Sequence, residues 1–198
     1  DKPDPNAALA AHASLRQAMH IITQNKRLKG LGLALSITWL LSGTISSFEP
    51  IYMADLGAST SIIGLANALN AAIELPAMLW ADKLVKRYTP GRLLRWSLLL
   101  QIVRMVAVLI YPSVPTLIAM RVVLGIEFSF FTVGMVAYIN AYSPRTYRAT
   151  MMALYGMTLR NLMMMVGSPL TGMFYDAFGA YWLYAIGLLG PIVAWLVL

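Results

Sequence analysis

The sequence predicts an all-α membrane protein, because charged residues are scarce, apolar residues form long runs, and basic residues gather between those runs. Of 198 residues, 59% are hydrophobic and 12% are charged, whereas about a quarter of a soluble domain is charged. A bilayer core of about 30 Å needs about 20 mostly apolar helical residues to cross it. Six windows in residues 28–198 meet this requirement, and we expect them to be transmembrane helices: 28–52, 61–80, 92–111, 115–140, 147–174 and 181–198.

Two segments precede the first window. Residues 1–13 contain two prolines and small side chains without an apolar period, and they indicate a cytoplasmic linker. Residues 14–27 place Leu15, Met19 and Ile22 at helical spacing, which favours an amphipathic lead-in at the membrane surface. An ordinary extension of the first helix fits equally well. The chain starts without Met and stops within an apolar run, so we expect a piece of a longer protein.

The basic residues predict an orientation. Lys and Arg precede the first window and lie in the connections after the second and fourth, at 26–29, 83–95 and 145–148, while the other connections contain none. This alternation places both ends of the segment and the basic connections in the cytoplasm. It also explains the net charge of +7 by membrane flanks, so the expected partner is a lipid bilayer and not a nucleic acid.

Ionisable side chains lie inside the predicted spans. A carboxylate such as Glu127 at the centre of a span costs roughly 2.5–3.5 kcal/mol on insertion scales and is by default a functional-site candidate. Glu74 and Arg104 lie on two other spans, which suggests a shared polar cavity. The residues expected to line it are Thr38, Ser42, Glu49, Asn67, Asn70, Glu74, Gln101, Tyr138 and Asn161. Packing between helices is an alternative role for the small polar side chains among them.

Enzyme chemistry finds no support in the sequence. The chain has no Cys, and its two histidines, His12 and His20, lie in the polar N-terminal stretch. It contains no G-x-S-x-G, no H-E-x-x-H and no phosphate-binding loop. We therefore expect a protein that is not an enzyme and that holds no metal or cofactor.

Three motifs together resemble those of the major facilitator superfamily, from about Ser14 onward. They are "AMLWADKLVKRY" after the second span, "SPRTYRATMMALYG" after the fourth, and "GMFYDAFG" at the end of the fifth. The resemblance implies that the six helices form one half of a transporter, a 3+3 inverted repeat. The partner would be an N-terminal six-helix half, supplied by the same longer chain or by a second copy. It further implies a conformational lock formed by Asp82, Lys83, Arg87, Arg148 and Asp176.

Within the superfamily the chain is most similar to proton symporters of the lactose permease and phenylpropionate permease group. "VRMVAVLI" places Arg104 on the coupling arginine, and "RVVLGIEFSFFTVGMVAYI" places Glu127 on the proton-carrying carboxylate and Arg121 on a lysine. Leu124 replaces a histidine of the lactose permease, and Asn67 replaces its sugar-binding glutamate. The resemblance therefore implies proton coupling without fixing a galactoside as the solute.

The expected function is secondary active transport of a small organic solute by alternating access, as a proton symport with Glu127 as proton carrier. The expected location is a bacterial cytoplasmic (inner) membrane. The alternatives are an uncoupled facilitator or exporter, a non-transporting receptor or scaffold, and a six-helix half-transporter that dimerises. A static ion pair of Glu127 with Arg104 or Arg121 is the purely structural explanation of the buried charges.

Overall fold

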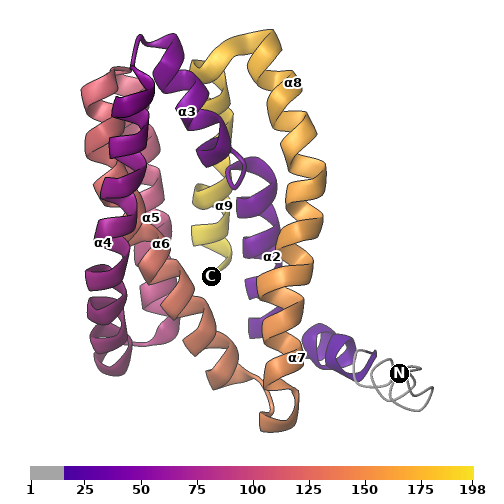
Figure 1. Cartoon of the computed structure of the whole chain (residues 1–198). Helices are drawn as coiled ribbons and strands as arrows, with labels where there is room; N and C mark the ends of the chain where they lie inside the picture. The colour runs from indigo at the N-terminus through magenta and orange to yellow at the C-terminus, as the bar shows by residue number, and fades with distance from the viewer. Residues whose placement is uncertain (1–15) are drawn as a thin grey trace, which may run out of the picture.

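The computed structural model describes residues 16–198, and this part of the chain is helical without any strand. The helices run alternately up and down along one axis (Figure 1). The predicted all-α membrane fold is confirmed, while the predicted linker at residues 1–13 lies outside the described residues. The elements are α2 (Lys26–Leu41), α3 (Ile45–Asp55), α4 (Thr60–Arg87), α5 (Pro90–Ile110), α6 (Val114–Tyr142), η1 (Arg145–Tyr147), α7 (Arg148–Ala153), η2 (Leu154–Leu159), α8 (Arg160–Gly187) and α9 (Leu189–Val197).

Five helical stretches in the described part are long and apolar enough to cross a membrane. The last, Arg145–Val197, is 53 residues long and contains both the fifth and the sixth predicted windows. The backbone turns at Gly179, whose φ of 77° and ψ of 174° are not helical. This region of backbone space is open almost only to glycine. The sixth window therefore begins inside α8 and continues through α9.

The first predicted span is broken in the middle. Helix α2 ends at Leu41, α3 begins at Ile45, and residues 42–44 form a turn between them. A Cβ on Gly43 would lie 2.7 Å from the carbonyl oxygen of Trp39, so a side chain does not fit there. Thr44 and Thr171 of α8 share a buried hydrogen bond between their hydroxyl groups. The break changes the direction in which α3 presents its side chains.

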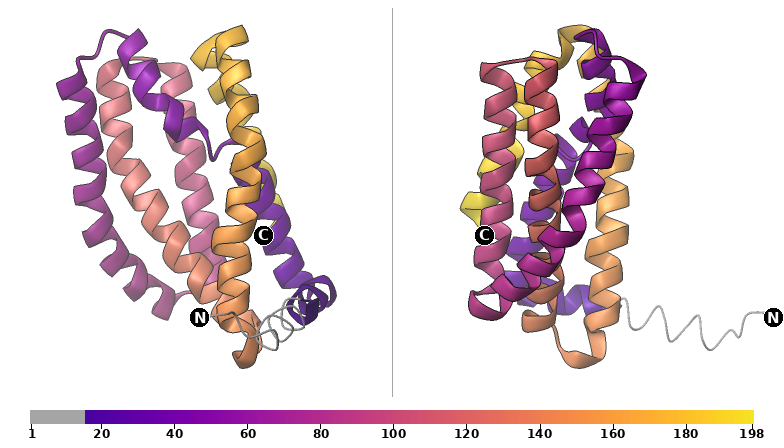
Figure 2. Two further views of the ribbon diagram at one scale, coloured as in Figure 1. Left: turned by 45° about the vertical axis from the view of Figure 1, so that its right-hand side comes forward. Right: turned by 60° about the vertical axis from the view of Figure 1, so that its left-hand side comes forward.

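The helices form two groups, α4 with α5 and α6, and α2 with α8 and α9. Small residues allow close approach within each group, as expected between helices in a membrane. A Cβ on Gly125 of α6 would lie 3.0 Å from the Asn70 carbonyl oxygen of α4, and one on Gly167 of α8 would lie 3.0 Å from that of Leu40. Figure 2 shows the two groups side by side from two further directions.

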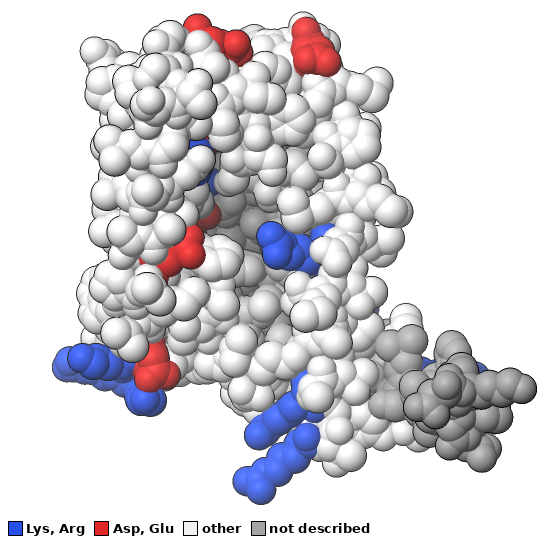
Figure 3. All heavy atoms as spheres, viewed as in Figure 1, with Lys and Arg blue, Asp and Glu red and all other residues white. Residues whose placement is uncertain are grey.

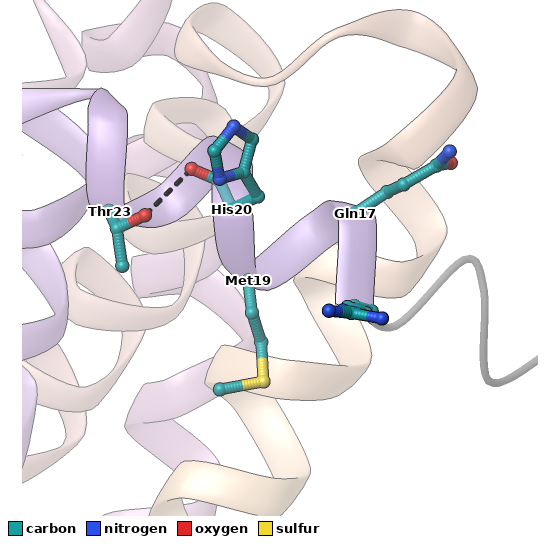
Figure 4. A pocket seen from close by; sticks show the side chains of 5 residues that line it. Gln17, Met19, His20 and Thr23 are labelled. Atoms are coloured by element: carbon teal, nitrogen blue, oxygen red, sulfur yellow. Dashed lines mark hydrogen bonds between the residues drawn. The ribbon is translucent and has the colours of Figure 1, made fainter.

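The predicted lead-in at residues 14–27 is not one continuous helix. Residues 16–24 are helical, and Asn25 then caps α2 by accepting a hydrogen bond from the Arg27 amide at 3.0 Å. Ala18 and Ile22 contact the core, whereas Met19, expected on the same face as Ile22, is 57% exposed. A shallow pocket lies beside Met19 and His20, where Thr23 donates to the His20 carbonyl oxygen at 2.8 Å (Figure 4).

Candidate functional site

A cavity of about 500 Å³ lies between the two helix groups. It opens on the face seen in Figure 3, where the molecule is hollowed and shows both acidic and basic atoms around the hollow. Arg160 of α8 lines it together with eight of the residues singled out in the sequence: Thr38, Ser42, Asn70, Glu74, Gln101, Arg104, Arg121 and Glu127.

Four of the predicted cavity residues lie elsewhere. Asn67 is exposed on α4, and Asn161 is exposed on α8 beside the cavity-lining Arg160. Tyr138 is buried in the core, where its ring centroid lies 4.6 Å from that of Tyr142. Glu49 is buried behind the cavity, in contact with the arginines that line it.

Four buried charges from α3, α5 and α6 form one cluster. Arg104, which is 1% exposed, donates from Nε to Glu127 Oε2 at 3.0 Å and from Nη1 to Glu49 Oε2 at 3.2 Å. Arg121 Nε lies 2.8 Å from Glu49 Oε1 as an ion pair. Tyr184 of α8 donates its hydroxyl hydrogen to Glu49 Oε2 at 3.1 Å. Glu49 is therefore the residue that joins both arginines.

The cluster balances two guanidinium groups against two carboxylates when all are ionised. Charges buried in this way need their partners, because removal of one partner leaves the other uncompensated. The two carboxylates differ in access. The Glu127 side chain is 12% exposed and lines the cavity, whereas that of Glu49 is 2% exposed and does not. Glu127 is thus the carboxylate of the cluster that a proton or solute in the cavity reaches.

Two residues that line the cavity carry buried polar atoms without a hydrogen-bond partner. These atoms are Nε and Nη2 of Arg121 and Oδ1 of Asn70. The Arg121 Nε–H is also misaligned with Glu49 in spite of the short ion-pair distance. Asn70 uses its amide nitrogen to donate to Glu74 Oε1 at 2.6 Å. Arg121 therefore has unsatisfied buried donors, and Asn70 has an unsatisfied buried acceptor.

The residues expected to form a lock lie apart in this structure. Asp82 pairs with Lys86 of the same helix at 2.5 Å, and both side chains are exposed. Asp176 lies near the other end of the bundle, since the neighbouring Tyr175 donates to Asp55 Oδ2 just before α4 begins. In residues 16–198 no hydrogen bond or ion pair joins Lys83, Arg87, Arg148 or Asp176 to another helix.

The sequence analysis did not predict two features of the site. Tyr184 carries a polar hydroxyl within an apolar run, and that signal marks it as a residue in need of a buried partner. The second is a π-helical turn at Leu154–Leu159, directly before Arg160. Turns of this kind often occur at functional sites, and its Gly156 lines the cavity. No local sequence signal predicts it.

Comparison with known proteins identifies a family. A sequence model of the MFS_1 like family matches residues 3–186. No curated protein matches the chain. Within residues 16–198, no three His, Cys, Asp or Glu residues are grouped so that they could hold a metal ion.

Proposed function

The chain belongs to the MFS_1 like family, and from this premise we propose that it is a proton symporter in which Glu127 holds the coupled proton. Family membership and the apolar helices make it part of an integral membrane transporter. The proposed cargo is a small organic solute, carried by alternating access between two halves that surround a central site.

The observation that carries the proposal is the position of Glu127. Its carboxylate binds Arg104 in the cluster and also lines the cavity. A proton on Glu127 removes one negative charge, weakens its bond to Arg104 and leaves a net positive charge in the cluster. Solute binding and protonation then influence each other through the same side chains, and such coupling acts equally in both directions.

The open face of the cavity supports a second half as the proposed partner. Apolar side chains of α4 and α8, including Leu75, Leu79, Leu170 and Met173, are exposed. A six-helix half from the same longer chain or from a second copy would cover this face. Alternating access requires such a second wall.

The proposed location is a bacterial inner membrane, with both ends of residues 26–198 in the cytoplasm. The basic residues before α2, at the end of α4 and before α7 lie at one end of the bundle, and Figure 3 shows Lys and Arg atoms gathered there. Such a distribution favours the cytoplasmic side for that end.

The test compares Glu127→Gln with the unaltered full-length protein in proteoliposomes. We expect Glu127→Gln to abolish solute accumulation driven by a proton gradient while solute exchange at equal pH continues. Asp55→Asn, an acidic-to-amide change outside the cavity, is the matched control and should leave both rates unchanged.

Three results would contradict the proposal. Accumulation at full rate by Glu127→Gln would remove the proton-carrier role. Loss of both accumulation and exchange would indicate a static ion pair with Arg104 that is needed for structure. An unaltered protein that equilibrates the solute without accumulating it would be an uncoupled facilitator.

A further inference from the structure

The cavity contains complementary unsatisfied groups. Arg121 is 5% exposed, yet its Nη2 donor has no hydrogen-bond partner, and the Asn70 Oδ1 acceptor is likewise buried and free. Buried polar atoms in folded proteins are nearly always paired, so unpaired ones at a binding cavity call for a ligand atom or ordered water. Arg121 requires an acceptor from the ligand, whereas Asn70 requires a donor.

Charges at each of the two groups favour the same kind of ligand atom as the unsatisfied hydrogen-bonding atom does. Asn70 lies beside the Glu74 carboxylate, which receives one hydrogen bond from the Asn70 amide and forms no ion pair within the described residues. A positively charged N–H group of a solute would find acceptors on both side chains. Arg121 shares its one carboxylate partner, Glu49, with Arg104. A guanidinium with free N–H groups is well suited to a carboxylate.

The two ends of this arrangement are separated along the bundle axis. Helices α4 and α6 run in the same direction, with Asn70 level with Gly125 and Glu74 level with Ser129, whose hydroxyl donates to the Glu74 carbonyl oxygen at 3.0 Å. Arg121 lies eight residues before Ser129 and four before Gly125, so a rise of 1.5 Å per residue places its Cα about 12 Å from the level of Glu74 and about 6 Å from that of Asn70. A solute that spans both ends needs several atoms between its charges.

The charges around the cavity also sum to zero. Three guanidinium groups (Arg104, Arg121 and Arg160) and two carboxylates (Glu74 and Glu127) line the cavity, and Glu49 supplies a third carboxylate behind Arg104 and Arg121. A solute with one charge would leave the group at the other end of the cavity without a counter-charge. A solute that carries both charges preserves the balance.

We propose that the cavity binds a zwitterionic solute, with its ammonium group at Glu74 and Asn70 and its carboxylate at Arg121. The solute is an amino acid whose amino and carboxyl groups are separated by a chain of several carbons. This inference deepens the proposed transport function and depends on it only for the direction in which the solute moves. One proton carried with such a neutral solute makes transport electrogenic, with one positive charge moved per solute.

The test measures equilibrium binding to the full-length protein in lipid nanodiscs with three sets of matched probes. The zwitterions are 4-aminobutanoate, 5-aminopentanoate and 6-aminohexanoate, each compared with the acid that lacks the amino group and the amine that lacks the carboxyl group. We expect one zwitterion to bind at least about tenfold more tightly than its acid and its amine, because a hydrogen bond to a charged group contributes at least about this factor.

Two variants assign the ends of the solute. Glu74→Gln should weaken zwitterion and amine binding about tenfold and leave acid binding unchanged. Arg121→Lys keeps a positive charge for Glu49 but loses the planar fork, so it should weaken zwitterion and acid binding and leave amine binding unchanged. Asp55→Asn is the control for folding and should bind all probes as the unaltered protein does.

The proposal is overturned if an acid or an amine binds as tightly as its zwitterion, if no zwitterion binds, or if neither variant changes the preference. None of these measurements uses a proton gradient. A failure here therefore leaves the proton-carrier test of Glu127 unaffected. Conversely, zwitterion binding without proton-driven accumulation would refute symport and retain the binding site.

Discussion

Glu49 is the residue whose replacement distinguishes most sharply between a connected charge cluster and separate ion pairs. It contacts Arg104, Arg121 and Tyr184 from a side chain that is 2% exposed. We consider Glu49→Gln, which keeps the size of the side chain and one acceptor oxygen but removes the negative charge.

The expected loss follows from the charges that remain. Glu49→Gln leaves Arg121 without any carboxylate partner, because Glu127 pairs only with Arg104. Removing one partner of a buried ion pair typically destabilises a protein by about 3–5 kcal/mol. Glu127→Gln makes the same chemical change in the same cluster, but Glu127 contacts one guanidinium and is 12% exposed. We expect its loss to be about 1.5–3 kcal/mol, the range for one hydrogen bond to a charged group.

The measurement is the free energy of unfolding of the full-length protein and both variants, from reversible denaturation in mixed lipid and detergent micelles. Glu49→Gln should be the less stable variant by roughly 2 kcal/mol, the difference between the midpoints of the two ranges. Equal losses would show that the connection through Glu49 adds nothing. A loss below about 1 kcal/mol for Glu49→Gln would mean that the cluster is not held together by its charge.

Three further predictions concern the backbone and the surface. Gly179→Ala should destabilise the protein by about 1–3 kcal/mol, because the backbone conformation at this position is nearly restricted to glycine. Gly64→Ala, with no atom within 4 Å of the new Cβ, should instead stabilise the protein by about 0.5–1 kcal/mol. If both variants lowered the melting temperature equally, backbone conformation would not be the cause. Gly43→Ala should lose about 1–3 kcal/mol by overpacking against Trp39, and an unchanged unfolding midpoint would show that the turn adapts. Asp82→Asn should change stability by about 0–1 kcal/mol, since its pair is exposed, but should slow transport if Asp82 belongs to a lock; an unchanged transport rate would rule that role out.

The sequence predicted the helical fold and part of the site because both depend on local patterns. Apolar length identifies each span, and the structure places helices over all six predicted windows. Helix ends outside the apolar region were missed, since α4 continues seven residues beyond Trp80 to Arg87. Hydropathy reports the thickness of the bilayer and not the hydrogen bonds that end a helix.

The sequence could not predict the arrangement around Glu49, because it depends on contacts between distant segments. A continuous helix would place Glu49 in line with Thr38 and Ser42, along the cavity. The break at residues 42–44 redirects α3 instead. The broken segment packs against glycines of α8 and α9; for example, a Cβ on Gly190 would lie 3.0 Å from Ser42 Oγ. Asn67 is exposed and does not line the cavity, although it lies two turns before Glu74 on nearly the same side of α4.

The position of Glu49 explains how a buried glutamate could take up a proton without disrupting the bundle. If Arg104 were paired with Glu127 alone, neutralising that carboxylate would leave a buried guanidinium without a counter-charge. Such an uncompensated buried charge strongly destabilises the folded protein. Arg104 also donates from Nη1 to Glu49, which itself is held by the Tyr184 hydroxyl. Neutral Glu127 therefore still leaves Arg104 with a carboxylate partner. In the proposed symport, the carboxylate of Glu49 would remain as the ionic partner of Arg104 when Glu127 takes up a proton.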